Sequence, residues 1–428
     1  MTTLVVTGGR VLSPDLSVAA ADVRIDQQRG EILDIGPDLD GEERIDAAGG
    51  LVMPGLVNAH THAAMTLLRG YADDKPLDRW LQEDIWPAEA ALKPADVRAG
   101  TDLALLEMIR SGTTAFADMY FHMGEVAEAV EAAGLKARLS HGIVTVGKDD
   151  EEAAADVQEG IEMAQAYDGY ADGRVRTALS PHSLTTVAEA FLRDTVEAAR
   201  DAGVPLHYHA NETTDEVDPI VTERGLRPLE FADDLEMVGG DDFLAHGVHL
   251  EDAEIELLAE RGASVVHCPA SNMKLASGMA PVQSLLDAGV GVALGTDGPA
   301  SNNDLDMFDE MRDAAMIGKL ASGDASAVPA ASVVRMATAG GANALGLGAG
   351  VLEAGRPADL IVVDFETPRL TPVHDHVSHL AYAASGSDVR HTVVDGEVLM
   401  RDREVDVLDE PAVRARASER ARSLVERV

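Results

Sequence analysis

Histidine and acidic residues recur at short spacings in this chain, and two histidines stand in the pattern His60-Thr61-His62. Side chains alternate across a β-strand, so residues two apart point to the same side of it. If this stretch is a strand, it offers two imidazoles to one metal ion. A single His-x-His pair is weak evidence, so the remaining ligands must come from other segments.

Two further segments supply those ligand types, with His209 in one and Asp297, flanked closely by Gly295 and Gly298, in the other. Three neutral imidazoles and one carboxylate suit a borderline divalent ion such as zinc, with one coordination position open for water. The alternative for Asp297 is the N-cap of a following helix. We rank the ligand role higher because the glycines leave room for an approaching site. The predicted metal ligands are therefore His60, His62, His209 and Asp297.

Glu212, three residues after His209, is the candidate proton carrier. A metal ion lowers the pKa of bound water to about 7, and a nearby carboxylate can accept that proton and pass it on. The alternative, in so acidic a chain, is a solvated surface glutamate. His246 ends its segment as His209 does, and we expect it to hold the attacking hydroxide. Three other histidines are interpreted as core residues outside the site: His207, His249 and His267.

These residues need elements that bring them together. Eight short apolar segments alternate with helical stretches rich in Ala, Glu and Leu, which is the pattern of repeated βα units. The eight segments are GLVNAHTH, TTAFADMY, KARLSHGIV, RVRTALSPHS, VPLHYHANE, FLAHGVHL, SVVHCPASN and GVALGTDG. Eight such units predict an α/β fold with a closed (β/α)8 barrel, whose chemistry lies at the C-terminal ends of the strands. Every candidate residue above ends or follows one of these segments, as does His182.

Short β segments also occur at both ends of the chain, near residues 4–37 and 358–400. We predict that they form one small β-sandwich from both termini. The expected domains are residues 1–53 and 351–428 for the sandwich and residues 54–350 for the barrel. The last stretch, from Glu410 onward, lacks internal Gly and is rich in Ala, Arg and Glu, which predicts a terminal helix.

Composition limits the partners. The 428 residues include 34 Lys and Arg against 75 Asp and Glu, for a net charge of −41. Nucleic acids and anionic membranes would be repelled, because their binding depends on cationic side chains. Only six of the 34 cations are Lys, and this acidic, lysine-poor surface resembles that of proteins from salt-loving archaea. The expected partner is a small molecule, and a homo-oligomer is compatible with the sequence.

Other chemistries lack their residues. Cys268 is the only cysteine, so neither an intrachain disulfide nor a Pro-Cys-x-x-Cys zinc site can form. The chain has no Gly-x-Ser-x-Gly elbow and no dinucleotide-binding Gly-x-Gly-x-x-Gly after a strand. No apolar run approaches the ~20 residues of a membrane span. We therefore expect a cytoplasmic protein.

Five motifs together resemble the amidohydrolase superfamily: residues 54–62, residues 209–213, residues 244–250, residues 269–275 and residues 295–303. Within it, the chain is most similar to the 5′-methylthioadenosine/S-adenosylhomocysteine deaminases, a branch that also contains triazine hydrolases. The resemblance extends from near Leu4 to about Met400. It implies a zinc-dependent aminohydrolase that acts on cyclic amidines. No Lys ends the fourth segment, where two-metal relatives carry a carboxylated lysine, so a single ion is expected.

The resemblance also implies roles. Glu212 would carry a proton from water to N1 of adenine, while His246 and Asp297 direct hydroxide to C6. Ammonia then leaves, giving the inosine analogue of a 5′-substituted adenosine such as 5′-methylthioadenosine, 5′-deoxyadenosine or adenosine. Glu89, in Trp86-Pro87-Ala88-Glu89, matches the ligand of the ribose hydroxyls, and His182 matches a substrate-contacting histidine.

One departure concerns S-adenosylhomocysteine. Relatives that bind it use two Arg for its carboxylate, and the corresponding region here has His141, then Lys148 and the acidic residues 149–152. This substrate is expected to be disfavoured. The alternatives are deamination of another aminated heterocycle, such as a guanine, a pterin or a triazine, and a metal-binding scaffold without catalysis. The presence of Glu212, His246 and Asp297 argues against the scaffold.

Overall fold

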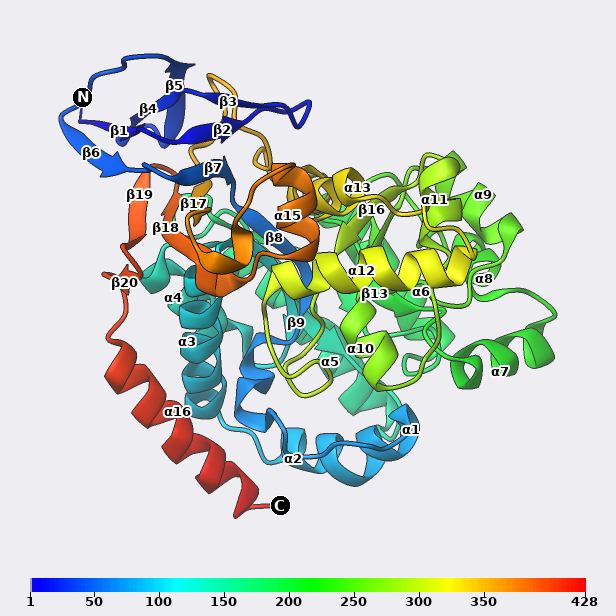
Figure 1. The fold of residues 1–428 in the computed structure, drawn as a ribbon. Coiled ribbons are helices and arrows are strands. Elements are labelled where there is room, and N and C mark those ends of the chain that lie inside the picture. Colours follow the sequence, from blue (N-terminus) through cyan, green and yellow to red (C-terminus); the bar gives the residue numbers. More distant parts are fainter. Residues whose placement is uncertain (1) are drawn as a thin grey trace.

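The computed structural model describes residues 2–428. The strands near the two ends of the sequence lie together at one end of the molecule, whereas α16 leads the C-terminus towards the opposite end (Figure 1). One four-stranded sheet has the order β5-β4-β1-β6, and one seven-stranded sheet has the order β20-β19-β18-β17-β7-β2-β3. The strands of the first sheet are β1 (Thr3–Thr7), β4 (Asp22–Asp26), β5 (Glu31–Gly36) and β6 (Glu43–Asp46). Those of the second are β2 (Arg10–Leu12), β3 (Val18–Ala20), β7 (Gly50–Pro54), β17 (Leu360–Asp364), β18 (Val389–Val394), β19 (Glu397–Arg401) and β20 (Glu404–Val405).

The second sheet joins the two ends of the chain. Strand β7 pairs antiparallel with β17, with Leu51 opposite Val363 and Pro54 opposite Leu360. Alternate residues of both sheets are buried in a shared apolar cluster that includes Leu4, Ile25, Val52 and Val362. Strands from the two ends of the sequence thus pair in one sheet and share one apolar cluster.

All eight predicted barrel segments form strands. They are β8 (Leu56–Thr61), β9 (Thr113–Tyr120), β10 (Lys136–Ile143), β11 (Val175–Thr177) with β12 (Ser180–Pro181), β13 (His207–Ala210), β14 (Phe243–His246), β15 (Ser264–His267) and β16 (Gly291–Leu294). The fourth segment was expected to be one strand and is two short ones. It ends at Pro181, which has no N–H for a sheet hydrogen bond. The strands are buried almost throughout, as expected of parallel strands covered by helices.

These strands form two parallel sheets, one with the order β11-β10-β9-β8 and β12 against β10, the other with the order β13-β14-β15-β16. Backbone hydrogen bonds connect the two sheets at both edges. The N–H of His209 donates to the carbonyl of His182 at 2.9 Å, and the N–H of Asp297 donates to the carbonyl of His60 at 3.0 Å. The ends of the strands that carry the candidate residues are thus tied to one another.

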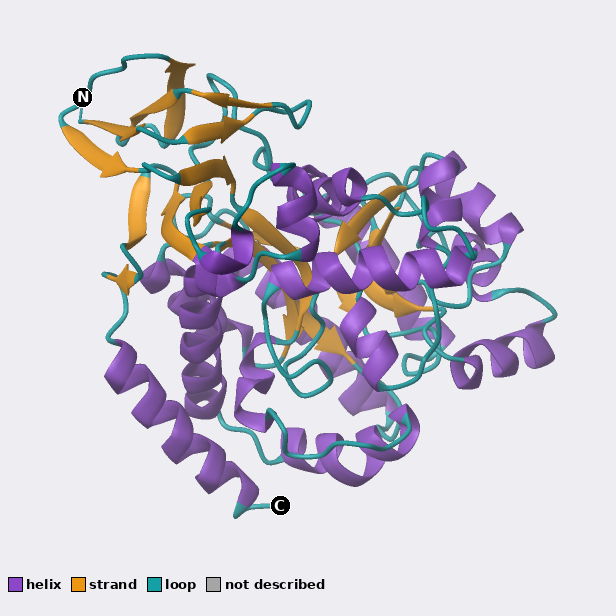
Figure 2. Ribbon diagram, in the orientation of Figure 1, coloured by secondary structure: helices purple, strands orange, loops and turns teal. Residues whose placement is uncertain are grey.

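Helices surround these strands (Figure 2). They are α1 (Leu77–Trp80), α2 (Trp86–Ala90), α3 (Pro94–Ser111), α4 (Met123–Ala133), α5 (Asp150–Tyr167), α6 (Glu189–Ala202), α7 (Thr214–Arg224), α8 (Pro228–Asp234), α9 (Asp252–Arg261), α10 (Pro269–Lys274), α11 (Val282–Asp287), α12 (Met307–Ser322), α13 (Ala330–Arg335), α14 (Gly341–Ala344), α15 (His376–Tyr382) and α16 (Glu410–Val425). The predicted terminal helix is α16, which packs on α3. None of the helices within residues 2–428 combines the length and apolar character that a membrane span requires.

Candidate active site

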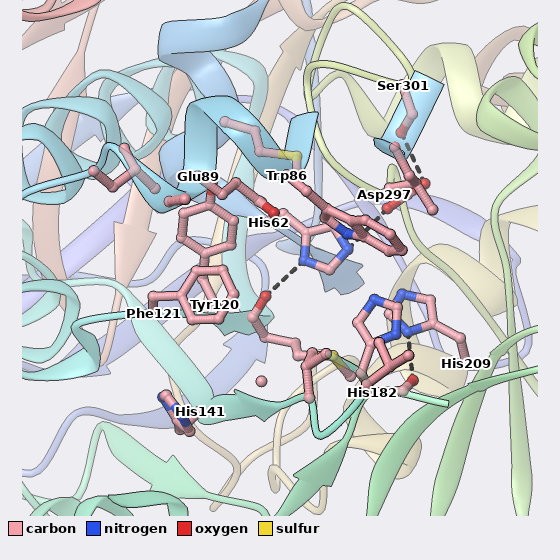
Figure 3. Close-up of a pocket in the computed structure, with 18 of the residues that line it drawn as sticks. His62, Trp86, Glu89, Tyr120, Phe121, His141, His182, His209, Asp297 and Ser301 are labelled. Carbon is pink, nitrogen blue, oxygen red and sulfur yellow. Dashed lines mark hydrogen bonds and ion pairs between the residues drawn. The ribbon is translucent and has the colours of Figure 1, made fainter. Parts of the chain in front are cut away.

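The C-terminal ends of the parallel strands open into a cavity of about 820 Å³. Its walls include six of the predicted site residues at one end, namely His62, His182, His209, Glu212, His246 and Asp297. Figure 3 shows His62, His182, His209 and Asp297 gathered there, with Glu89 beside His62 and His141 further away. The sequence therefore located the cavity correctly.

The two histidines of β8 both reach Asp297. His60 Nε2 lies 3.4 Å and His62 Nε2 lies 3.2 Å from Asp297 Oδ1. Between Asn58 and Thr61, β8 has one residue more than β9 opposite it, because Asn58 pairs with Phe116 and Thr61 with Asp118. Such a bulge turns side chains at a strand end. The imidazoles nevertheless face one point, as the His-x-His spacing predicted.

Hydrogen bonds at Nδ1 orient two of these rings. His62 Nδ1 donates to the carbonyl of Met119 at 2.6 Å, and His209 Nδ1 donates to that of His182 at 2.8 Å. A neutral imidazole carries one N–H, so both rings present a lone pair at Nε2. This is the usual arrangement of histidines that bind metal ions.

Asp297 lies between these rings with its own position fixed. Its Oδ2 accepts hydrogen bonds from Ser271 Oγ at 2.7 Å and Ser301 Oγ at 2.8 Å, while Oδ1 accepts one from the Gly298 N–H and faces the histidines. The N-cap alternative is wrong, because the next helix, α12, begins at Met307 and is capped by Asp306.

The glycines beside Asp297 have a different function from the predicted one. A Cβ on Gly295 would lie 2.8 Å from the backbone nitrogen of His60, and a Cβ on Gly298 would lie 2.6 Å from Met65 Sδ. They allow the backbone after β16 to pack directly against β8, rather than leaving room for a ligand. The side chain of Asn58 reinforces this approach through two hydrogen bonds to Thr296.

Two residues at strand ends adopt left-handed backbone conformations, His246 with φ 76° and Asp297 with φ 59°. This region is uncommon for any residue with a Cβ and costs on the order of 1–3 kcal/mol for each such residue. Conformations of this kind cluster at functional sites, where the surrounding structure holds them. Both residues therefore depend on their hydrogen bonds to stay in place.

Burial keeps most of these imidazoles neutral. It lowers the pKa of His60 to about 4 and that of His209 well below its usual value. Burial also opposes ionisation of Asp297, but the adjacent imidazoles of His60 and His62 outweigh it and hold the Asp297 pKa well below its usual value. For His62, the hydrogen bond and charge of Asp297 overcome the effect of burial and raise the pKa to about 9.

This donor set fits a divalent cation. The Nε2 atom of His60 is buried without a hydrogen-bond partner, beside lone pairs of other imidazoles and an ionised carboxylate. Neutral imidazole and carboxylate are ligands that zinc prefers. Without a metal ion, protonated His62 places a positive charge next to the Asp297 carboxylate. A bound cation would provide that positive charge in place of the proton.

His62 and His246 are alternative candidates for the remaining metal-ligand position. One group of residues has donor atoms all within 4.8 Å of one another: His60, His209, His246 and Asp297. It shares three members with the predicted set and contains His246 in place of His62. His246 Nδ1 donates to Asn272 Oδ1 at 2.9 Å, so its Nε2 also faces the cavity. The structure thus brings five candidate ligands together.

Glu212 is buried in this site and is not a solvated surface residue. Its Oε2 lies 3.7 Å from His246 Nε2, and its Oε1 accepts a weak hydrogen bond from Ser277 Oγ at 3.4 Å. Its backbone N–H donates to Glu216 Oε2 at 2.9 Å, which fixes the start of the loop into α7. Burial raises the pKa of Glu212. A carboxyl group with a raised pKa is suited to accept and return a proton near neutral pH.

The remaining predicted residues also line the cavity. Glu89, in α2, is half-buried, and desolvation raises its pKa to about 7. His182 packs against His209 with ring centroids 4.5 Å apart, and its Nδ1 bonds with Thr186 Oγ1 at 3.0 Å. Burial lowers the pKa of His182 to about 3, so this ring is neutral.

Of the three histidines assigned to the core, two lie away from the cluster. His249 Nε2 donates to the carbonyl of Ser277, and His267 is buried without a bonded ring nitrogen. The third, His207, lies 2.8 Å from His60, and the sequence analysis missed it. The available signal was the His207-Tyr208-His209 pattern, which repeats the His-x-His spacing of β8.

A parallel α/β fold with a buried His and Asp cluster at the strand ends, next to a glutamate, defines a metal-dependent hydrolase. Residues 51–399 match the family model described as the Amidohydrolase family. The chain belongs to this family, as its motifs predicted.

Similar proteins agree with this membership. The chain is 65% identical over 427 residues to a 5-methylthioadenosine/S-adenosylhomocysteine deaminase of Natronomonas pharaonis, covering 100% of this chain and 99% of the relative. It is 52% identical to a 5′-deoxyadenosine deaminase of Methanosarcina mazei, covering 90% and 89% of the two chains. A crystal structure of an adenosine deaminase from Xanthomonas campestris with bound zinc matches with a TM-score of 0.93 and 38% identity, covering 99% of each chain. Relatives from salt-loving archaea agree with the acidic composition.

Proposed function

We propose that this enzyme hydrolyses the amino group at C6 of 5′-substituted adenosines, giving the inosine analogue and ammonia. The observation that carries the proposal is the position of Glu212, buried 3.7 Å from His246 beside the metal-ligand cluster. Triazine or other heterocycle chemistry has no comparable support, because the named relatives at 52% and 65% identity are deaminases of adenosine derivatives.

The proposed metal ligands are His60, His62, His209 and Asp297, around one zinc ion. When bound, the ion would polarise a water molecule and lower its pKa. His246 stays free in this assignment to hydrogen-bond the attacking oxygen, which agrees with its Nε2 lying 3.7 Å from Glu212 Oε2.

Glu212 would take the proton of the attacking water and deliver it to N1 of the adenine ring. Its raised pKa makes the protonated form accessible near neutral pH. His246 and Asp297 hold the oxygen over C6 from the other side. Glu212 would then take the remaining proton of the oxygen added at C6 and pass it to the departing amino group, so that ammonia leaves, a carbonyl forms at C6 and Glu212 returns to the carboxylate.

The rest of the cavity would bind the nucleoside. Glu89, beside His62 in the cavity wall (Figure 3), would accept hydrogen bonds from the ribose hydroxyls. His182 is neutral and next to His209. With its Nδ1 accepting from the Thr186 hydroxyl, its N–H is at Nε2 and would donate to the substrate. The apolar residues Leu77, Trp80, Leu81 and Trp86 line the space beside Glu89 and suit the adenine ring or an apolar 5′ group.

The far end of the cavity bears on the 5′ substituent. Lys148 Nζ is paired with Asp156 Oδ2 at 2.9 Å, and His141 Nε2 lies 3.1 Å from Asp156 Oδ1. Glu159, 3.8 Å from His141 Nδ1, adds a second carboxylate. Among residues 2–428, no cation that lines this end is free for a substrate carboxylate, which needs one to offset its desolvation. We therefore expect neutral 5′ groups to be preferred over the amino-acid group of S-adenosylhomocysteine.

We also infer the domain boundaries and a closed barrel. The hydrogen bonds from His209 to His182 and from Asp297 to His60 support the joining of both parallel sheets into one eight-stranded barrel of residues 54–350. The apolar cluster shared by the two antiparallel sheets supports a β-sandwich made of residues 1–53 and 351–428.

The test is turnover of adenosine, 5′-deoxyadenosine and 5′-methylthioadenosine by the purified protein at molar salt. The ultraviolet spectrum should shift from the adenosine type to the inosine type, with one ammonia per nucleoside. Absence of this shift, together with release of ammonia from guanine, a pterin or a triazine, would replace the proposal. Full metal occupancy with no turnover of any of these compounds would favour a scaffold.

A further inference from the structure

A fully buried histidine outside the proposed ligand set contacts that set directly. His207 Nε2 lies 2.8 Å from His60 Nδ1, and both side chains have no exposed surface. The other ring nitrogen of His60, Nε2, points at Asp297. His60 is therefore hydrogen-bonded at Nδ1, by His207 on the side away from the cavity, while its Nε2 has no hydrogen-bond partner.

One proton lies between His60 Nδ1 and His207 Nε2. Which of the two rings carries it determines whether His60 can bind a metal ion through Nε2. If His207 Nε2 carries it, neutral His60 has its N–H on Nε2, where a metal ion would need a lone pair. If His60 Nδ1 carries it and donates to His207, the lone pair of His60 lies at Nε2, toward Asp297. Only the second arrangement makes His60 a metal ligand, and it requires an acceptor at the position of His207 Nε2.

His207 is rigidly placed to be that acceptor. Its ring stacks on Phe243, with centroids 4.3 Å apart and planes 22° apart, and it meets the His60 ring at 87°. Its backbone N–H donates to the carbonyl of Leu179 at 3.0 Å. Strand β13 thus carries His209, which is in the cluster, and His207, which lies on the same face two residues earlier and contacts His60 of β8.

We propose that His207 is a positioning residue that fixes the ring orientation and the tautomer of His60 and thereby sets the affinity of the metal site. This inference rests on the proposed function only in that His60 is taken as a ligand. Residues that hydrogen-bond a metal-binding histidine typically contribute 10- to 100-fold to metal affinity.

The test compares His207→Leu with His207→Gln in the full-length chain. Leu fills similar space without an acceptor, whereas the Gln amide oxygen can reach the position of Nε2. Zinc affinity is measured by competition with a chromophoric chelator, and the visible spectrum of the cobalt-substituted protein reports the ligand geometry. We expect His207→Leu to bind zinc about 10- to 100-fold more weakly, with an altered cobalt spectrum, and His207→Gln to recover most of the affinity.

His267 provides the matched control. It is equally buried, on β15, and neither of its ring nitrogens has a partner. His267→Leu should therefore keep wild-type zinc affinity. If His207→Leu does not fold, His207→Asn replaces it, because the shorter amide cannot reach the position of Nε2.

Three results would overturn the inference: unchanged zinc affinity in His207→Leu or its Asn replacement, equal weakening in His207→Gln, or equal weakening in His267→Leu. The last two would show a packing effect. Failure of the proposed function looks different, since the wild-type protein itself would then bind no zinc or would not deaminate adenosines.

Discussion

The imidazole of His246 and the carboxylate of Glu212 lie 3.7 Å apart in the cavity wall. The His246 ring donates from Nδ1 to Asn272, and the backbone N–H of Glu212 donates to Glu216. An acceptor of protons and a donor of a hydrogen bond thus face the same small volume beside the proposed metal ligands. Because both hydrogen bonds involve groups away from the reacting atoms, each residue can be changed without removing the support of the other.

Replacing Glu212 by Gln should keep the fold and the metal content and lower kcat about 10²- to 10⁴-fold. The amide occupies the same space and still accepts the hydrogen bond of Ser277, but it cannot carry a proton. Steady-state deamination and metal analysis of the same preparation test this. A near-normal kcat would assign the proton transfer to another group.

His62→Ala and His246→Ala should separate the two candidate ligands. The purified wild-type enzyme should contain about one divalent ion per chain, and His62→Ala, like His209→Ala, should lose it. His246→Ala should retain the ion and lose turnover. The reverse metal contents, measured on dialysed samples, would place His246 in the ligand set and exclude His62. Two ions per chain in the wild type would contradict a single-metal site.

The 5′ substituent should be selected by charge. We expect kcat/KM to be about tenfold or more higher for 5′-methylthioadenosine than for S-adenosylhomocysteine, because a hydrogen bond to a charged group is worth about 1.5–3 kcal/mol. Asp156→Asn should narrow this difference, because it releases Lys148 while its amide oxygen can still accept from the Val144 N–H.

The control for Asp156→Asn is Glu152→Gln, because Glu152 is also in α5 but does not line the cavity. Glu152→Gln should leave the ratio of the two kcat/KM values unchanged. Equal turnover of the two substrates by the wild type, measured side by side at high salt, would show that another cation serves the carboxylate.

Glu89 should make stability depend on pH. A carboxyl group with a folded-state pKa raised from 4.5 to about 7 stabilises the fold fully below about pH 4.5 and loses this contribution as the pH rises through 7. A glutamine at position 89 does not ionise. The Tm of Glu89→Gln minus the Tm of the wild type should therefore increase by a few degrees between pH 5 and pH 8. Glu419→Gln, exposed on α16, should show a constant difference. A constant difference for Glu89→Gln would contradict the raised pKa.

Salt should stabilise the protein. Screening by potassium chloride through the molar range relieves repulsion among 75 acidic residues that only 34 cations offset. Thermal unfolding at constant pH should show a Tm that rises with salt. A flat or falling Tm would contradict the halophilic interpretation.

The sequence predicted the eight strands and the cavity residues because both depend on local pattern. His60, His209 and Asp297 end buried strands, and parallel strands bring their C-terminal ends to one place. Two features of the site could not be predicted from the sequence. Whether His62 or His246 completes the ligand set depends on distances within the cluster, and the support of His60 by His207 depends on the neighbourhood of two non-adjacent strands.

The glycines illustrate the same limit. Gly295 and Gly298 lie beside Asp297 because of close packing, which no spacing encodes: Gly295 packs against the backbone of His60, and Gly298 packs against the side chains of Met65 and His62. Likewise, the sequence identified Lys148 as a candidate cation, while only the structure shows that Asp156 already pairs with it.

The pairing of β7 with β17 has a consequence for synthesis. Strand β7 leaves the ribosome early, but its partner follows roughly 300 residues later, at a synthesis rate of about 5–20 residues per second. For that interval β7 lacks one neighbour, and its apolar residues Leu51 and Val52 are without their native cover. The parallel strands β8 to β16 lie between them in the sequence and emerge before β17 can pair with β7. In the growing chain, the part that carries the active site can therefore fold first, and the terminal sheet is completed afterwards.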